Sequence, residues 1–312
     1  MIYSFLEGRM FRKCQRYWYF GKRLASPTAK DPLRREAYLL GKLQSIHAWR
    51  GRIVDQVIEK IIVPCLQRNT KVTLQTALQG AKKIFDSQLD FALNRRIFET
   101  GFKASAHEDD LAALFCIEYG QPPTPAEIEK ARSEINAALS NLFQSPNFKE
   151  VRDSIKAAYR ITAQCPITFP YAGATVRAVP DLICLFRGAP PLIIDWKVHF
   201  FGVHDYYQQL VSYAIVLTNC GPHNSLPSEL RRYPAHEVRL VEVQLLTNEA
   251  RPHIIAQEDV VAVEDRMAME IQQMLMAVDG RESKELTAED FPVTNRLGAC
   301  ETCNFRKLCW NN

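Results

Sequence analysis

Two aspartates and a lysine lie in one short apolar stretch of the chain. Asp181 opens a run of aliphatic residues, and Asp195 and Lys197 close the next run. A turn around Gly188 separates the two runs, which is typical of a β-hairpin. Each aspartate is seven residues from Gly188. A turn centred there places the two carboxylates opposite each other, with Cβ atoms roughly 4.5–5.5 Å apart, and it places Lys197 on the same face as Asp195.

Paired carboxylates among aliphatic residues predict a bound divalent cation. Like charges directly opposite in a sheet are destabilising, and Mg²⁺ is commonly held by one or two carboxylates together with substrate phosphate oxygens. Such an ion lowers the pKa of a bound water, while the ammonium of Lys197 can orient the nucleophile or stabilise charge on phosphorus. The chemistry indicated is phosphodiester hydrolysis. The alternative is a surface hairpin with two solvated aspartates, but the mostly apolar sequence Leu192–Lys197 favours an interior strand.

These residues resemble the motif of the PD-(D/E)xK nuclease superfamily. Pro180-Asp181 matches its first element, and Asp195-Trp196-Lys197 matches its second. The resemblance implies that Asp181 and Asp195 hold Mg²⁺ or Mn²⁺. It also implies that Trp196, or Ile194, supplies a backbone carbonyl and that Lys197 positions or activates water.

A second match lies just downstream. The stretch Asp205–Ala214 predicts a helix with Asp205 as its N-cap, and Gln209 and Tyr213 share one helical face because they are four residues apart. The pair resembles the Q-x-x-x-Y signature of RecB-type members of the superfamily. The resemblance implies that both side chains border the metal site and contact DNA.

The third metal ligand is open between two residues. RecB-like members carry Gly-x-x-x-His on a helix near the N-terminus, whereas here Gly51 is followed by Asp55. Aspartate keeps an oxygen ligand suited to Mg²⁺ or Mn²⁺. His47 lies eight residues earlier in the same predicted helix and is the less favoured candidate.

Four cysteines form a third match. Cys300, Cys303 and Cys309 are closely spaced at the end of the sequence, and Cys14 lies near its start. Thiolate quartets hold iron–sulfur clusters or zinc. The spacing resembles the iron–sulfur clasp of RecB-like nucleases such as AddB and the CRISPR adaptation nucleases, which implies a [4Fe–4S] cluster that joins the chain ends. Zinc at the same cysteines is the alternative.

The predicted elements indicate an α/β protein. Helical periodicity is found over residues 33–62, 72–100, 124–145 and 257–278, and strand-like patterns over 159–170, 176–186 and 237–246. The resemblance implies a restriction-endonuclease-like core, a small mixed sheet flanked by helices, behind a helical N-terminal part. The predicted division is an iron–sulfur clasp of residues 1–30 and 280–312, a nuclease core of 31–70 and 150–279, and a helical insertion of 71–149.

Composition sets the remaining limits. The chain has 312 residues, a net charge of +4 and nine cysteines, and the five cysteines outside the quartet do not predict a disulfide framework. Basic residues alternate with aromatic ones near Arg9–Arg23, a composition that suits contact with a nucleic acid. The sequence has neither an apolar run near 18 residues nor a secretory h-region, so we expect no membrane span and a cytoplasmic location.

Two functions of different classes follow. The first is a metal-dependent deoxyribonuclease, expected to be an exonuclease on single-stranded DNA or DNA ends, in DNA repair or antiviral defence. The second is a non-catalytic or partner-dependent DNA-binding subunit of a helicase–nuclease or CRISPR/defence complex. The combination of Asp181, Asp195 and Lys197 favours the enzyme, because a binding module does not need them.

Overall fold

The computed structural model of the protein describes residues 1–99, 101–103, 107, 110–198, 206–221, 226–227 and 233–310. In this part, none of the helices is both long enough and apolar enough to cross a membrane. Two short π-helical turns, η1 (Phe20–Leu24) and η2 (Ile58–Ile62), extend α2 and α4. The α-helices are α1 (Phe5–Lys13), α2 (Gln15–Tyr19), α3 (Pro32–Leu40), α4 (Ile46–Val57), α5 (Val63–Gln67), α6 (Leu74–Leu93), α7 (Phe115–Glu118), α8 (Pro125–Gln144), α9 (Lys149–Ala157), α10 (Tyr206–Asn219), α11 (Gln257–Val278), α12 (Leu297–Glu301) and α13 (Arg306–Trp310).

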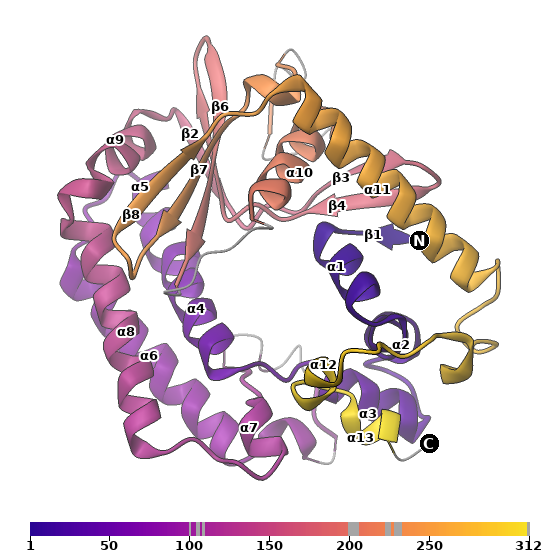
Figure 1. Ribbon diagram of the computed structural model, residues 1–312. Coiled ribbons are helices and arrows are strands. Elements are labelled where there is room, and N and C mark those ends of the chain that lie inside the picture. The colour runs from indigo at the N-terminus through magenta and orange to yellow at the C-terminus, as the bar shows by residue number, and fades with distance from the viewer. Residues whose placement is uncertain are drawn as a thin grey trace.

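The strands form two small sheets, as Figure 1 shows. The larger has the order β2-β5-β6-β7-β8, with β6 and β7 parallel and the other neighbours antiparallel. The smaller has the order β1-β4-β3. The predicted α/β architecture of a mixed sheet flanked by helices is therefore confirmed, although the strands form two sheets where one was predicted. The strands are β1 (Ile2–Tyr3), β2 (Arg160–Ala163), β3 (Ile167–Tyr171), β4 (Ala174–Ala178), β5 (Leu182–Phe186), β6 (Ala189–Lys197), β7 (Arg239–Gln244) and β8 (Glu249–His253).

The predicted strand over 176–186 is wrong in one respect, because it is two strands. β4 ends at Ala178 and pairs with β1 and β3, whereas β5 begins at Leu182 and pairs with β2 and β6. Pro180 lies in the connection, and proline has no backbone N–H with which to continue a ladder. The break leaves Asp181 immediately before β5, at the end of an interior strand of the larger sheet.

The predicted helix over 33–62 is also interrupted. α3 ends at Leu40, and α4 begins at Ile46 after Ser45, whose hydroxyl accepts a hydrogen bond from the Ala48 N–H at 3.1 Å. This is the N-cap arrangement that starts a new helix. The predicted helices over 72–100, 124–145 and 257–278 correspond to α6, α8 and α11. The predicted N-cap Asp205 lies outside the described residues.

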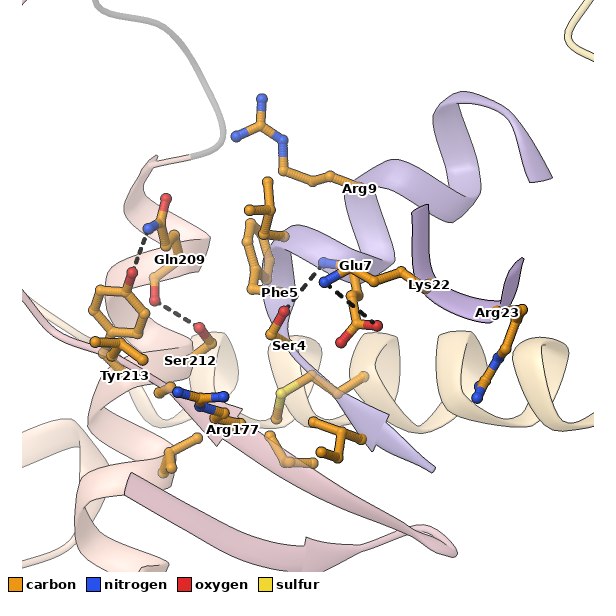
Figure 2. Close-up of a pocket in the computed structure, with 17 residues that line it drawn as sticks. Ser4, Phe5, Glu7, Arg9, Lys22, Arg23, Arg177, Gln209, Ser212 and Tyr213 are labelled. Carbon is orange, nitrogen blue, oxygen red and sulfur yellow. Dashed lines mark hydrogen bonds and ion pairs between the residues drawn. The ribbon is translucent and has the colours of Figure 1, made fainter. Parts of the chain in front are cut away.

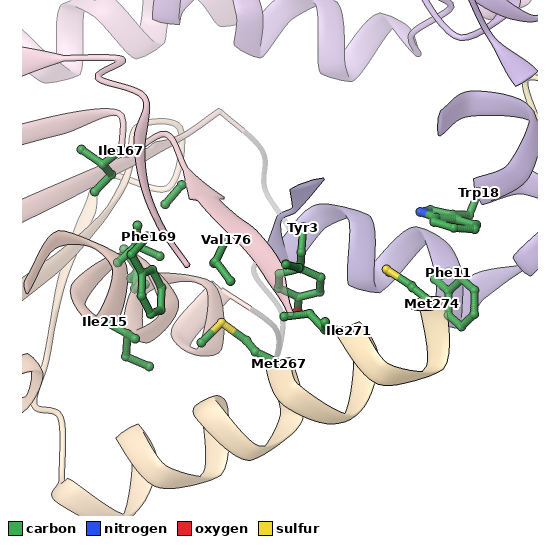
Figure 3. Packing of buried hydrophobic residues seen from close by; sticks show 14 of the residues in the cluster. Tyr3, Phe11, Trp18, Ile167, Phe169, Val176, Ile215, Met267, Ile271 and Met274 are labelled. Carbon is green, nitrogen blue, oxygen red and sulfur yellow. The ribbon is translucent and has the colours of Figure 1, made fainter. Parts of the chain in front are cut away.

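Both faces of the larger sheet are covered by helices. Successive side chains of a strand point to opposite faces, and alternate residues of β5 and β6 belong to two different buried clusters. The first cluster joins the sheet to α10, α11 and the N-terminal helices, and Figure 3 shows part of it; the second joins the sheet to α4, α6 and α8. Burial on both faces explains the nearly continuous apolar runs of these strands. The residues concerned are Ile183, Leu185 and Ile193 in the first cluster, and Leu182, Cys184, Leu192 and Ile194 in the second.

The first and last segments of the chain lie side by side, as Figure 1 shows. Arg16 Nε donates to the Phe291 carbonyl at 3.1 Å, and the Tyr19 hydroxyl donates to the Leu286 carbonyl at 3.0 Å. The rings of Tyr19 and Phe291 are stacked, with centroids 4.8 Å apart. The packing of these ends agrees with a clasp there, and the division into clasp, core and insertion stays a prediction.

A buried ionic cluster ties the N-terminal segment to α11. Glu270 is fully buried on α11 and accepts a hydrogen bond from the Tyr3 hydroxyl at 2.8 Å. It also forms ion pairs with Arg12 of α1 and Arg266 of its own helix. Gly8 leaves room for this carboxylate, since a Cβ atom there would lie 1.8 Å from Glu270 Oε2.

Gly8→Ala is therefore expected to lower the free energy of unfolding by about 3 kcal/mol, because it overpacks the site and displaces a buried charge from its partners. Urea denaturation measures this change. Gly51→Ala is the matched control, because a Cβ atom at this position in α4 meets nothing within 4 Å. Removing a helical glycine there should stabilise the protein by up to about 1 kcal/mol. Equal stability of wild type and Gly8→Ala would contradict the prediction.

Candidate active site

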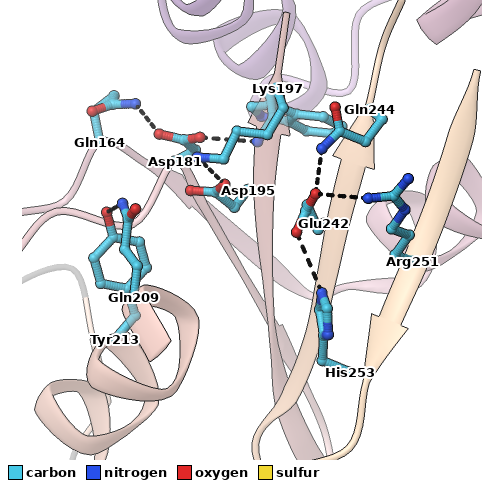
Figure 4. Close-up of polar contacts among 11 residues, drawn as sticks. Gln164, Asp181, Asp195, Lys197, Gln209, Tyr213, Glu242, Gln244, Arg251 and His253 are labelled. Carbon is cyan, nitrogen blue, oxygen red and sulfur yellow. Dashed lines mark hydrogen bonds and ion pairs between the residues drawn. The ribbon is translucent and has the colours of Figure 1, made fainter. Parts of the chain in front are cut away.

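Asp181 and Asp195 meet as the sequence predicts. The antiparallel register of β5 and β6 pairs Leu182 with Ile194 and Ile183 with Ile193, so the next pair along is Asp181 and Asp195. Asp181 Oδ2 accepts a hydrogen bond from the Trp196 N–H at 2.9 Å, and its Oδ1 accepts one from Gln164 Nε2, also at 2.9 Å. The Asp181 carboxylate is thus fixed across the end of the hairpin (Figure 4).

Lys197 forms an ion pair with Asp195, which is 2% exposed. Burial alone lowers the pKa of Lys197, but the charges of Asp195 and Asp181 outweigh it, so its net pKa lies above the ordinary value. Lys197 is therefore an ammonium at neutral pH. Its Nζ also lies 4.3 Å from the centroid of the Tyr206 ring.

Asp55 of α4 belongs to the same electrostatic group. Burial, together with the charge of Asp195, raises the pKa of Asp55 to about 7, against the opposing effect of Lys197. Burial and the charges of Asp195 and Asp55 likewise raise the pKa of Asp181 well above its ordinary value. Burial also raises the pKa of Asp195, although Lys197 acts in the opposite direction. Asp55, Asp181 and Asp195 therefore carry more negative charge than the single cation Lys197 can balance.

His47 is placed differently. It lies in the first turn of α4 and is exposed. Eight residues of helix separate it from Asp55, which corresponds to about 12 Å along the axis. The position of His47 favours Asp55 as the third acidic group.

Gln209 and Tyr213 lie on α10 beside the carboxylates. Gln209 Nε2 donates to the Tyr213 hydroxyl at 2.5 Å. Burial raises the pKa of Tyr213, and the charges of Asp195 and Asp181 add to the effect. The shared helical face predicted for this pair is therefore directed towards the two aspartates (Figure 4).

One buried acid beside the site, Glu242 on β7, is not among the residues predicted from the sequence. It is paired with Asp195 in the parallel register of β6 and β7, so the two side chains share a face. His253, whose Nε2 lies 3.4 Å from Glu242 Oε2, lowers the pKa of Glu242 despite its burial, and the hydrogen bond from Gln244 adds to the effect. Its charge is therefore neutralised by neighbours of its own (Figure 4). The signal was available, since Glu242 is a lone acid on the apolar face of a predicted strand.

The donor set fits a hard divalent cation by its chemistry. Carboxylate oxygens are the ligands that Mg²⁺ and Mn²⁺ prefer. Asp195 Oδ2 is buried, and its partner among the described residues is the Lys197 ammonium. The N–H and C=O of one strand residue point towards the same neighbouring strand. Because the Trp196 N–H donates to Asp181 Oδ2, the Trp196 carbonyl also points towards the Asp181 side of the strand. Among the described residues, however, no three His, Cys, Asp or Glu side chains are already arranged to hold a metal ion.

The four predicted cysteines line one small cavity between the two ends of the chain. Burial raises the pKa of Cys303 to about 11, and the neighbouring Cys14, Cys309 and Cys300 add to the increase. Cys14 Sγ accepts a hydrogen bond from the Tyr17 N–H at 3.4 Å, which caps α2. The fold therefore places Cys14 beside Cys300, Cys303 and Cys309.

The raised pKa of Asp55 predicts a pH-dependent effect of Asp55→Asn. The folded pKa lies above the unfolded one, so stability is full below about pH 4 and is lost as the pH rises through about 7. At pH 8 without divalent cations, Asp55→Asn should be more stable than wild type by up to roughly 4 kcal/mol, since the pKa of Asp55 is raised from 3.8 to about 7 and one pKa unit is about 1.4 kcal/mol. At pH 5 the difference should be less than half of its value at pH 8, because the effect builds up between the unfolded and the folded pKa. Urea denaturation in EDTA at both pH values measures it.

The matched control is Asp153→Asn on α9, where a hydrogen bond from Lys149 lowers the pKa of an exposed carboxylate. This variant should gain no stability at pH 8. A loss of stability in Asp55→Asn at pH 8, or the same gain at both pH values, would contradict the burial of Asp55 among like charges.

Comparisons with known proteins bear on this arrangement. A model of the PD-(D/E)XK nuclease superfamily matches residues 4–310, a range that contains every candidate residue described above. No curated protein matches the sequence. One similar solved structure is a crystal structure, at 2.19 Å resolution, of a protein from Eubacterium rectale described provisionally as an exonuclease. The two chains are 10% identical over 81% of this chain and 86% of that chain, with a TM-score of 0.32, a similarity too low to carry a functional inference.

Proposed function

The chain belongs to the PD-(D/E)XK nuclease superfamily, and we propose that it is a metal-dependent deoxyribonuclease acting on single-stranded DNA or DNA ends. Its mixed α/β architecture is consistent with the restriction-endonuclease-like fold of that superfamily. The observation that carries the proposal is the meeting of Asp181, Asp195 and Lys197 at the end of one hairpin, with Asp55 electrostatically coupled to them.

Asp181, Asp195 and Asp55 would hold Mg²⁺ or Mn²⁺, together with the Trp196 carbonyl. When bound, such an ion lowers the pKa of a coordinated water and neutralises charge on the phosphate. Asp55 is preferred to His47 because Asp55 shares the raised pKa values of the site, whereas His47 is exposed. Gln164 and the Trp196 N–H hold the Asp181 carboxylate in one orientation.

Lys197 acts as a cation in this proposal. Because the charges of Asp195 and Asp181 raise its pKa, it donates hydrogen bonds to the attacking water or to a phosphate oxygen. An ammonium that is already fixed beside the pentacoordinate phosphorus of the transition state stabilises the negative charge that develops on its oxygens. Burial strengthens this interaction because the local dielectric is low.

Gln209 and Tyr213 would align the strand. The Gln209–Tyr213 hydrogen bond fixes the hydroxyl beside the carboxylates, and burial raises the pKa of Tyr213, so the hydroxyl stays neutral. A neutral phenol can donate to a phosphate oxygen without repelling it. The pair thus positions substrate and takes no part in proton transfer.

Cys14, Cys300, Cys303 and Cys309 would hold a structural [4Fe–4S] cluster, or alternatively zinc. The proposal is supported by the common cavity of these cysteines and by the packing of the two chain ends around it. Phosphodiester hydrolysis transfers no electrons, so the cluster would stabilise the fold. An ultraviolet–visible spectrum distinguishes the two, because zinc bound by thiolates is colourless.

The test is a cleavage assay on anaerobically purified protein. End-labelled linear and circular DNAs, single- and double-stranded, are incubated with Mn²⁺, Mg²⁺ or EDTA. The proposal expects cleavage that requires a divalent cation and that degrades linear single strands from their ends. No cleavage of any substrate would overturn it and would favour a partner-dependent DNA-binding subunit.

A further inference from the structure

A second cavity lies next to the candidate active site. Its volume is about 570 Å³, and it lies between α1, η1, β4 and α10. Figure 2 shows α10 and α1 on opposite sides of it. Tyr213 and Gln209, the pair bordering the carboxylates, form part of its wall. The cavity and the active site therefore share a boundary on α10.

The wall of this cavity is strongly basic. Four of the lining side chains are cations, and Glu7 is the one acid among the described residues that line it. These cations come from three separate parts of the chain, α1, η1 and β4, so they do not form the solvated face of a single helix. They are Arg9, Lys22, Arg23 and Arg177.

Two of these cations are incompletely satisfied inside the protein. Arg23 Nε is buried without a hydrogen-bond partner in the described residues, and its guanidinium lies 4.7 Å from the centroid of the Trp18 ring. Lys22 lies 3.9 Å from Glu7, which is too long for a hydrogen bond. Burial lowers the pKa of Arg23, as expected for a cation whose lost hydration has not been replaced.

Glu7 accounts for only part of this positive charge. It is 8% exposed, and burial raises its pKa, which the charges of Lys22, Arg23 and Arg177 oppose. Glu7 balances at most one of the three cations Lys22, Arg23 and Arg177. The cavity therefore keeps a net positive charge, and its size suits a small anionic group. The apolar part of its wall, including Phe5 and Met267, can contact a sugar or base.

We propose that this cavity binds a phosphate group of the substrate strand next to the cleaved bond, with Lys22 and Arg177 as its outer contacts and Arg23 as its inner contact. The inference rests on the proposed function for the identity of the anion. Backbone phosphates contribute most of the affinity of proteins for nucleic acids, and each contact adds to the salt dependence. A phosphate held here would place the neighbouring nucleotide against Tyr213 and so towards Asp195.

The test measures binding without cleavage. A fluorescein-labelled single-stranded oligonucleotide is titrated with protein in EDTA at several salt concentrations, and anisotropy is recorded. The Lys22→Ala/Arg177→Ala double variant should bind roughly tenfold more weakly at low salt, with a log–log salt slope smaller by about 1.4, that is 0.7 for each contact. Glu7→Gln, which removes the opposing charge, should bind more tightly than wild type.

The matched control is Lys83→Ala/Lys130→Ala, which removes two exposed charges from α6 and α8 and should bind as wild type does. Equal weakening by both double variants, unchanged binding by Lys22→Ala/Arg177→Ala, or no binding by wild type would overturn the inference. A parallel cleavage assay with Mn²⁺ separates the two proposals. If the Lys22→Ala/Arg177→Ala variant binds more weakly but the wild type does not cleave, only the nuclease proposal is contradicted. If the wild type and this variant cleave equally well, only the phosphate site is contradicted.

Discussion

Lys197→Ala is expected to lower the rate of DNA cleavage by roughly 10²–10³-fold, because one fixed donor aimed at developing charge contributes about this much. Lys197 is 13% exposed and forms an ion pair with Asp195. Its replacement removes the ammonium and leaves the oxygen ligands in place. Binding of Mn²⁺ should therefore persist while catalysis is lost. Initial cleavage rates and circular dichroism spectra of the two proteins measure activity and folding together.

Lys149→Ala is the matched control for this prediction. Lys149 is an exposed lysine on α9 that also pairs with an aspartate, Asp153, at 2.7 Å. It lies outside the site, so the variant should cleave at the wild-type rate. A Lys197→Ala protein that is folded and fully active would show that the reaction needs no ammonium at this position.

Cys303→Ser is expected to have the largest effect on stability, at least about 3 kcal/mol, with loss of visible absorbance. A structural metal centre contributes its binding free energy to folding, and serine is a poor ligand for iron. Cys303 is surrounded by the other three cysteines of the cavity. Its backbone is held as well, because the Arg306 N–H donates to the Cys303 carbonyl at 3.2 Å. Thermal unfolding and the absorbance spectrum of anaerobically purified protein measure both effects.

Cys65→Ser controls for the general cost of replacing a half-buried cysteine. Cys65 lies on α5, outside the cavity of the quartet. The Cys65→Ser variant should keep the visible absorbance of the wild type and unfold at nearly the same temperature. A colourless wild-type protein as stable as Cys303→Ser would remove the cluster from the account, and a colourless protein destabilised by the mutation would indicate zinc.

The candidate site was largely predictable because it depends on local geometry. The two aspartates lie at equal distances from Gly188, and they are opposite each other because a β-bulge between Cys184 and Phe186 shifts the register by one residue from that of the Phe186–Ala189 pair at the turn. The common face of Gln209 and Tyr213 follows in the same way from the helical repeat. Neither result needs knowledge of any contact between distant parts of the chain.

The features that the sequence did not predict depend on long-range packing. The division at Pro180 between β4 and β5 reflects the pairing of β4 with Ile2 and Tyr3, more than 170 residues away in the sequence. The choice between Asp55 and His47 depends on which face of α4 meets the sheet. Glu242 is recognised only once β7 is placed beside β6. Sequence periodicity defines faces, but it does not show which faces meet.

In the proposed function, the carboxylates of Asp55, Asp181 and Asp195 share a divalent cation without which the protein does not cleave DNA. The most direct measurement is a Mn²⁺ titration followed by electron paramagnetic resonance, with cleavage rates recorded on the same samples of wild type and Asp195→Asn. Cleavage by the wild type should rise along its Mn²⁺-binding curve, and Asp195→Asn should lose both Mn²⁺ binding and cleavage. Full cleavage in EDTA, or undiminished Mn²⁺ binding and activity in Asp195→Asn, would contradict it.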